Sequence, residues 1–225
     1  MVRVALWDWD QLVDYVDIPP WVIDLDSFRR WMDSEEFPDK DRIEYIKGQV
    51  WIDLSKEQLF SHVAVKTEAT AVLAPLVKAA RRGLFFGDGA FVTNVDTDIA
   101  VKPDAVFVSH AARQDRVRFL EGTKSGYVEM EGSPDMVLEV VSDSSVRKDT
   151  ERLRSDYWEA GIREYWLVDA RQEPLVFDIL RHTPKGYRTA AKKDGWIKSN
   201  VFGKSFRLTC QTSEHGDPEY TLEVR

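Results

Sequence analysis

The sequence has few of the features that mark secreted or membrane proteins. A single cysteine, Cys210, is present, so no disulfide can form within the chain. No apolar run approaches the roughly 18 residues that a membrane-spanning helix needs. The first ten residues, MVRVALWDWD, gain acids and lack the basic, apolar and small-residue order of a secretory signal. These absences predict a cytoplasmic protein with no membrane partner.

Positive charge is also scarce. The net charge of −8 argues against a protein that coats nucleic acid through charge alone, because such binding depends on neutralising phosphates. The balance is uneven, with 7 Lys/Arg against 14 Asp/Glu in residues 1–60 and 10 against 7 in residues 171–225. The basic residues of the C-terminal part could follow a nucleic-acid backbone, although lysines at strand edges commonly serve to block aggregation. They are Arg181, Lys185, Arg188, Lys192, Lys193 and Lys198.

The length and apolar content indicate one substantial core. With 225 residues, 43% of them hydrophobic, we expect a single domain over residues 1–225. Prolines at 19, 20 and 38 delimit an expected N-terminal arm, residues 1–40, with a short helix at about 25–32 that packs on the main body. Residues 41–170 are expected to form the core, and residues 171–225 a β-rich extension.

The pattern within the core predicts a mixed α/β (α+β) architecture. Alternating runs on either side of Lys47-Gly48 indicate a hairpin. Apolar residues at helical spacing predict a long helix from about residue 58 to 82 and a second from about 146 to 160. Strand-like runs lie between and after these helices. We therefore expect a mixed sheet flanked by helices, followed by strands.

One strand carries a charge in its middle. In PDMVLEVVSDSS, Glu139 interrupts an apolar run and shares a face with Asp135, but the two lie about 13 Å apart at strand rise, too far to share an ion. Asp104, in KPDAVFVS, begins another strand. If those strands are neighbours, about 4.8 Å apart, Asp104 and Glu139 could hold a divalent cation between them. The residues alone leave open the commoner arrangement, in which Asp104 caps a turn and Glu139 pairs with an arginine.

Several short motifs in order give a more specific indication. The segments are RIEYIKGQVW, a helix carrying SH, KPDAVFVS, SPDMVLEVVSDSS and KDTERLRSDYWEAGIREYWLVD. In order and spacing they resemble the Uma2 (Uma-two) family of restriction-endonuclease-like proteins, within the PD-(D/E)XK nuclease superfamily. The resemblance covers about residues 42–169 and extends to about residue 208. It implies a restriction-endonuclease-like fold.

The resemblance also implies a site and a chemistry. Asp104 and Glu139 would be catalytic and would bind Mg²⁺ or Mn²⁺, with the Val140 carbonyl as a further ligand, and Glu44 matches an acid of the family that could be an extra ligand. The metal would activate a water for attack on a phosphodiester, with DNA as the expected substrate. His62 matches a family histidine that could face the site. Relatives that cut two strands commonly act as homodimers, which we expect here.

The sequence departs from the family at the catalytic lysine. Two residues after Glu139 stands Val141, and the alternative lysine position on the following helix is Leu153. Lys148 and Arg152 are the nearest cations, and we favour Lys148, because a desolvated lysine can lose its proton whereas arginine cannot act as a base.

Two other functions stay open. The missing lysine and the acidic charge are also compatible with a catalytically weak or inactive binding or regulatory module that keeps the nuclease fold. A glycosidase that uses a carboxylate pair has no support beyond the pair itself.

Overall fold

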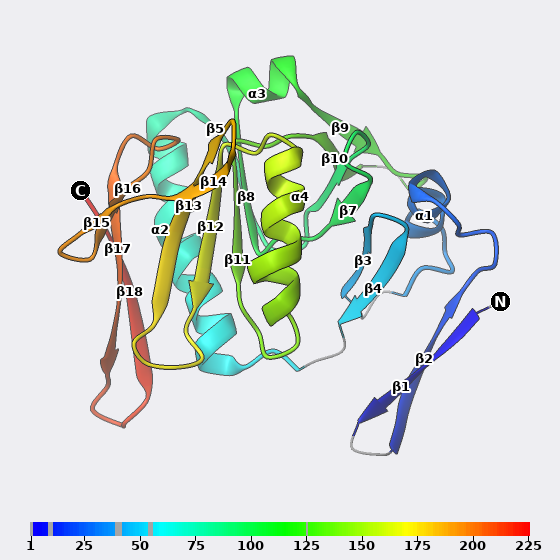
Figure 1. The fold of residues 1–225 in the computed structure, drawn as a ribbon, viewed down its shortest axis with the longest axis horizontal. Coiled ribbons are helices and arrows are strands. Elements are labelled where there is room, and N and C mark those ends of the chain that lie inside the picture. Colours follow the sequence, from blue (N-terminus) through cyan, green and yellow to red (C-terminus); the bar gives the residue numbers. More distant parts are fainter. Residues whose placement is uncertain (1, 9–10, 39–41, 54–55, 125) are drawn as a thin grey trace.

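The structure is a computed structural model, and it describes residues 2–8, 11–38, 42–53, 56–124 and 126–225, with side chains from residue 16 onward. Its main layers are two six-stranded sheets, which we call the central sheet and the second sheet (Figure 1). Helices and a C-terminal sheet cover the remaining faces. The predicted mixed α+β architecture, with strands following the helical core, is confirmed, and the second sheet is an addition that sequence patterns did not predict.

The central sheet has the order β14-β13-β12-β11-β8-β5. Its strands are β5 (Gly83–Gly87), β8 (Ala105–Ser109), β11 (Met136–Val140), β12 (Glu164–Asp169), β13 (Val176–Thr183) and β14 (Gly186–Thr189). Strands β11 and β12 run parallel, and β8 pairs antiparallel with β11. The parallel connection from β11 to β12 passes through a helix, as such crossovers require.

The second sheet has the order β4-β3-β7-β6-β10-β9. Its strands are β3 (Arg42–Ile46), β4 (Gln49–Asp53), β6 (Phe91–Asn94), β7 (Ile99–Val101), β9 (Val117–Glu121) and β10 (Tyr127–Gly132). Strands β3 and β4 form the predicted hairpin, and Lys47 and Gly48 at its turn have φ of 47° and 80°, the left-handed values that a tight hairpin turn needs.

Two smaller sheets lie at the ends of the chain. The N-terminal hairpin consists of β1 (Val2–Asp8) and β2 (Gln11–Ile18). The C-terminal sheet has the order β15-β16-β17-β18, with β15 (Lys192–Lys193), β16 (Trp196–Lys198), β17 (Ser205–Thr212) and β18 (Pro218–Val224). Helix α1 (Leu25–Met32) follows the N-terminal hairpin and begins with a capping box between Asp24 and Ser27. The expected arm therefore begins as a hairpin, and Phe28 and Trp31 of α1 pack on the second sheet.

Helices α2 (Val65–Ala80) and α4 (Leu153–Glu159) cover opposite faces of the central sheet (Figure 1). Leu73 of α2 packs in the same core as Leu138 of β11 and Phe206 of the C-terminal sheet. Leu153 and Tyr157 of α4 pack in a separate core with Val137 and with residues of the second sheet. Met136, Leu138 and Val140 thus face α2, whereas Val137 and Glu139 face α4, as the strand alternation predicts. A short helix, α3 (His110–Asp115), connects β8 to β9.

Helices α2 and α4 each follow directly on a π-helical turn. The turn η1 (Leu59–Ala64) leads into α2, and η2 (Lys148–Arg152) leads into α4. π-helical turns are rare in proteins overall, and those that exist are often found at functional sites. Their i→i+5 hydrogen bonds displace side chains from ordinary helical positions. Here the two π-helical turns carry His62 and Lys148, both of which sequence analysis had singled out.

Candidate active site

Strand pairing brings Asp104 and Glu139 together. In the antiparallel ladder between β8 and β11, Ala105 lies opposite Leu138, so the next pair along is Asp104 with Glu139. Both carboxylates are buried. The condition set by the sequence, that the two strands be neighbours, is therefore met, and directly opposite residues have Cβ atoms about 4.5–5.5 Å apart.

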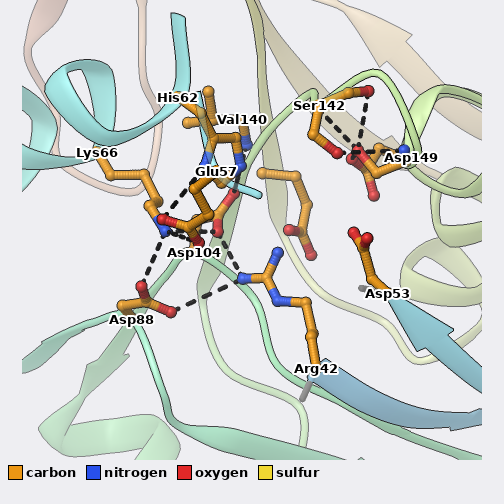
Figure 2. Close-up of polar contacts among 12 residues, drawn as sticks. Arg42, Asp53, Glu57, His62, Lys66, Asp88, Asp104, Val140, Ser142 and Asp149 are labelled. Atoms are coloured by element: carbon orange, nitrogen blue, oxygen red, sulfur yellow. Dashed lines mark hydrogen bonds and ion pairs between the residues drawn. The ribbon is translucent and has the colours of Figure 1, made fainter. Parts of the chain in front are cut away.

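Four groups surround the Asp104 carboxylate (Figure 2). Its Oδ2 accepts a hydrogen bond from the Val140 peptide N–H at 2.7 Å and lies 3.7 Å from His62 Nε2. Its Oδ1 pairs with the Arg42 guanidinium at 2.6 Å and lies 3.8 Å from Lys66 Nζ. Asp104 thus joins β11 to the hairpin strand β3 and to the first turns of the α2 helix.

The Glu139 carboxylate has only one of its oxygens hydrogen-bonded. Tyr157 of α4 donates its hydroxyl to Oε1 at 2.6 Å, while the buried Oε2 has no partner among the described residues. Burial raises the pKa of Glu139 well above its usual value, and the nearby carboxylates of Asp149 and Asp104 raise it further. A buried carboxylate with an unused oxygen is costly unless a donor or a cation compensates it.

A second set of charged groups adjoins Glu139. Lys148 is buried, and its Nζ lies 2.7 Å from Oε2 of Glu44 and 3.7 Å from Oδ1 of Asp149. The other oxygen of Glu44 accepts the peptide N–H of Lys102 at 2.9 Å. Asp149 Oδ2 accepts the Ser145 hydroxyl. Glu44, which we predicted as an extra metal ligand, has both oxygens engaged and acts here as the anchor of Lys148.

Burial alone would lower the pKa of Lys148, as the choice of this lysine assumed. The carboxylates of Glu44, Asp149 and Glu139 outweigh burial, and the net effect is a raised pKa. The amine therefore stays protonated at neutral pH. This corrects the reason given for choosing Lys148: it can supply a positive charge and hydrogen-bond donors, but not a general base.

Acidic side chains stand at the solvent edge of the site. Asp88, 51% exposed, lies 2.9 Å from Lys66 Nζ and 3.7 Å from Arg42, and Glu57, 46% exposed, lies 2.6 Å from Lys66 Nζ. Figure 2 shows Lys66 and Arg42 reaching Asp88 from two sides, each also joined to Asp104. These two cations thus lie between the exposed acids and the buried carboxylate, where an anion that approached Asp104 would meet them.

Other residues from the sequence analysis lie outside this cluster. Arg152 directs its guanidinium to Asp156 and to the Ile46 carbonyl, both at 3.5 Å, whereas Lys148 reaches Glu44, two residues earlier on β3. Val141 and Leu153 are fully buried core residues. Asp135 pairs with Arg116 at the opposite end of β11, which agrees with its exclusion on strand geometry.

Sequence reasoning missed several members of the cluster, among them Arg42, Lys66, Asp88 and Tyr157. Arg42 and Lys66 had no local signal, since charged residues are ordinary at a strand start and on a helix. Asp88 lies in the short sequence GDG between β5 and β6 and has φ of 57°. Tyr157 is a fully buried residue of α4 whose hydroxyl is the donor to Glu139.

The donor set suits a hard divalent cation. Carboxylate oxygens are the ligands that Mg²⁺ and Mn²⁺ prefer, and Mg²⁺ usually keeps several waters beside one or two carboxylates. The unpartnered Oε2 of Glu139 beside Asp104 provides such a pair. Within the described ranges, no group of three or more His, Cys, Asp or Glu is placed to enclose an ion. A cation here would therefore be held by two carboxylates and solvent.

Comparison with known proteins supports the assignment of a nuclease-like fold. A crystal structure described as "a putative nuclease belonging to DUF820", from Anabaena variabilis ATCC 29413, superimposes with a TM-score of 0.59 and 18% sequence identity, over 80% of this chain and 91% of the other. No curated protein matches the sequence. In the described part of the chain, no helix is long and apolar enough to cross a membrane. Residues 25–211 match the model of a family described as "putative restriction endonuclease", and the chain therefore belongs to the Uma2 family.

Proposed function

We propose that the protein is a Mg²⁺- or Mn²⁺-dependent endonuclease that hydrolyses phosphodiester bonds of DNA at the Asp104–Glu139 site. The observation that carries the proposal is that the buried Asp104, just before β8, accepts the Val140 N–H beside the buried Glu139 of β11, and that Glu139 Oε2 has no partner among the described residues. An unsatisfied buried acid reduces stability, so its presence beside a second acid needs a functional explanation.

Asp104 and Glu139 would hold the cation, which, when bound, lowers the pKa of a coordinated water and offsets charge on the phosphate. Neighbouring residues would hold both carboxylates in position around the cation. Tyr157 fixes Glu139 through its hydroxyl, and the Val140 N–H fixes Asp104, so both carboxylates are oriented before a ligand arrives. This preorganisation means that little rearrangement of the acids is needed during reaction.

The cations of the site would bind and orient the phosphate. Lys66 and Arg42 lie between the exposed acids Glu57 and Asp88 and the buried Asp104. A phosphodiester entering from this side would replace Asp88 as the partner of both cations, and arginine in particular can bind two phosphate oxygens at once. Lys66 and Arg42 would thus supply the positive charge that relatives obtain from the lysine absent at Val141.

His62 and Lys148 would complete the site without acting as the base. His62 Nε2 is 3.7 Å from Asp104 Oδ2, close enough to place an imidazole donor beside the acid or the phosphate. Lys148, protonated and held by Glu44, would stabilise negative charge near Glu139. The attacking water must then lose its proton to solvent or to a substrate phosphate.

The test is cleavage of plasmid DNA and of single-stranded oligonucleotides with Mg²⁺ or Mn²⁺, together with calorimetric titration of the metal. We expect metal-dependent cleavage and one metal site, both lost in Asp104→Asn. Asp178→Asn is the matched control, because Asp178 is half-buried on β13 and pairs with Lys192 outside the site. The proposal fails if the folded wild-type protein binds neither metal and cleaves no nucleic acid. Sedimentation of the same samples tests the expected homodimer.

One observation favours a second candidate, a binding module without catalysis. Asp104 already has a complete set of partners in Arg42 and the Val140 N–H, so the charge network can persist without metal. If this candidate is right, Arg42→Met would leave Asp104 without its arginine partner, so that the variant either gains affinity for a divalent cation or loses stability. Nucleic-acid binding by the wild-type protein would not depend on divalent ions. Metal-dependent binding of DNA would rule this candidate out.

A further inference from the structure

A second cavity lies at the opposite end of the central sheet from the carboxylate site. It has a volume of about 600 Å³, within the range of small-molecule binding sites, and its walls include Asp135, Glu164, Arg82, Arg163 and Arg181. Asp135 precedes β11, whereas Glu139 stands four residues further along, about 13 Å at strand rise. The cavity is therefore separate from the site described above.

Three arginines from distant segments meet at this cavity. Arg82 follows α2, Arg163 precedes β12, and Arg181 lies on β13 in the basic C-terminal part of the chain. Backbone carbonyls hold two of them, since Arg82 donates to the Phe202 carbonyl at 3.1 Å and Arg181 to the Lys198 carbonyl. These bonds fix the side chains but leave their charge uncompensated.

Neither Arg82 nor Arg181 forms an ion pair with any carboxylate in the described part of the chain. The buried Nε of Arg181 also has no hydrogen-bond partner among the residues that the structure describes. Arg82 is exposed and Arg181 half-buried beside the cavity, so both guanidinium groups are free to pair with an anion that enters it.

The two acids of the cavity are already fully used. Asp135 accepts hydrogen bonds from the Ser109 N–H at 2.7 Å and from Arg116 at 2.6 Å, and it pairs with Arg163 at 3.2 Å. Glu164 accepts from the Ser199 hydroxyl, the Trp166 indole and the peptide N–H groups of residues 200 and 201. Asp135 is thus paired with two arginines and Glu164 is satisfied by four neutral donors, so neither acid needs Arg82 or Arg181, which are left for an anion.

We infer that this cavity binds a phosphomonoester, such as the phosphate of a free nucleotide or the 5′-phosphate end of a nucleic-acid strand. Guanidinium groups match phosphate in geometry as well as charge, and a phosphomonoester carries about −1.5 to −2 at neutral pH. A cavity lined by three arginines suits such a terminal group better than a continuous phosphodiester backbone, which needs an open groove.

The experiment is calorimetric titration of the full-length Asp104→Asn protein in metal-free buffer, so that the carboxylate site neither binds metal nor cleaves. The probes are inorganic phosphate, adenosine 5′-monophosphate against adenosine, and one oligonucleotide with or without a 5′-phosphate. We expect inorganic phosphate and adenosine 5′-monophosphate to bind with a Kd below about 1 mM, adenosine not to bind, and the 5′-phosphorylated oligonucleotide to bind more tightly than the same strand without that phosphate. Whichever of the nucleotide and the phosphorylated strand binds more tightly shows whether the phosphate comes from a free nucleotide or from a strand end.

The variant Arg82→Ser/Arg163→Ser should raise the Kd at least about tenfold. The matched control is Lys124→Ser/Arg147→Ser, which removes two cations that are 77% and 87% exposed elsewhere, and it should leave the Kd unchanged. If the double variant does not fold, Arg163→Gln alone replaces it, because this side chain is 59% exposed and its loss should leave the fold intact. The single variant should also raise the Kd. No binding of any phosphorylated probe, equal binding of adenosine, or an equal loss in the control would overturn the inference. DNA cleavage by the wild-type protein is measured separately, so the two proposals can fail independently.

Discussion

The contribution of Asp149 to stability should fall as pH rises toward neutrality. Its carboxylate is buried in the π-helical turn η2, and burial raises its pKa from the ordinary 3.8 to about 7, against the opposing effects of Lys148 and Ser145. The nearby acids Asp104 and Glu44 raise the pKa further. The folded protein therefore holds a proton that the unfolded chain has already released.

The sign and size follow from proton linkage. Between the unfolded pKa of 3.8 and the folded value of about 7, the folded state binds more protons, so the free energy of unfolding decreases as pH increases. At 1.36 kcal/mol per pKa unit, the whole interval corresponds to on the order of 4 kcal/mol. The contribution is complete below about pH 4 and is lost by about pH 7 to 8.

The assay is urea unfolding of the wild type and of Asp149→Asn at several values between pH 4 and 8. Asn keeps an acceptor for the Ser145 hydroxyl and removes the titration. We expect the variant to gain stability relative to the wild type as pH rises, by up to on the order of 4 kcal/mol. Asp156→Asn controls for the change of chemistry, since Asp156 is buried on the same helix but paired with Lys47 at 2.8 Å. A difference between wild type and Asp149→Asn that does not change with pH would refute the reasoning.

Three further outcomes can be measured. Mg²⁺ at about 100 times its Kd should raise the free energy of unfolding by about 2.7 kcal/mol in the wild type and not in Glu139→Gln, as thermal melts with and without metal would show. Lys66→Met should lower metal-dependent DNA cleavage at least about 100-fold in single-turnover assays while metal affinity is retained; unchanged cleavage would remove Lys66 from the proposed site. Trp166→Ala, which removes a buried ring in contact with Phe177, Phe202 and Phe206, should cost about 3–5 kcal/mol in denaturant unfolding. Trp21→Ala, at a side chain 42% exposed, is its control, and two separate transitions would contradict the expectation of one domain over residues 1–225.

Local patterns were sufficient for the features that depend on a few neighbouring residues. Alternation along residues 135–141 places Glu139 on the face opposite Leu138 because successive side chains of a strand point in opposite directions. The Lys47-Gly48 turn follows from the left-handed backbone values that such a hairpin requires. The same arguments identified Asp104 and Glu139 as candidates and excluded Asp135, whose partners lie at the other end of β11.

The tertiary structure decided which charges meet. Asp88, Lys66 and Arg42 come from a turn, a helix and a strand that are ordinary in isolation, and only the order of strands and the position of α2 bring them to Asp104. The protonation of Lys148 also depends on Glu44, about a hundred residues away in sequence, because electrostatic effects act through space and not along the chain. Sequence by itself thus identified the pair of acids as candidates, and the fold determined which cations and which hydroxyl surround them and how deeply they are buried.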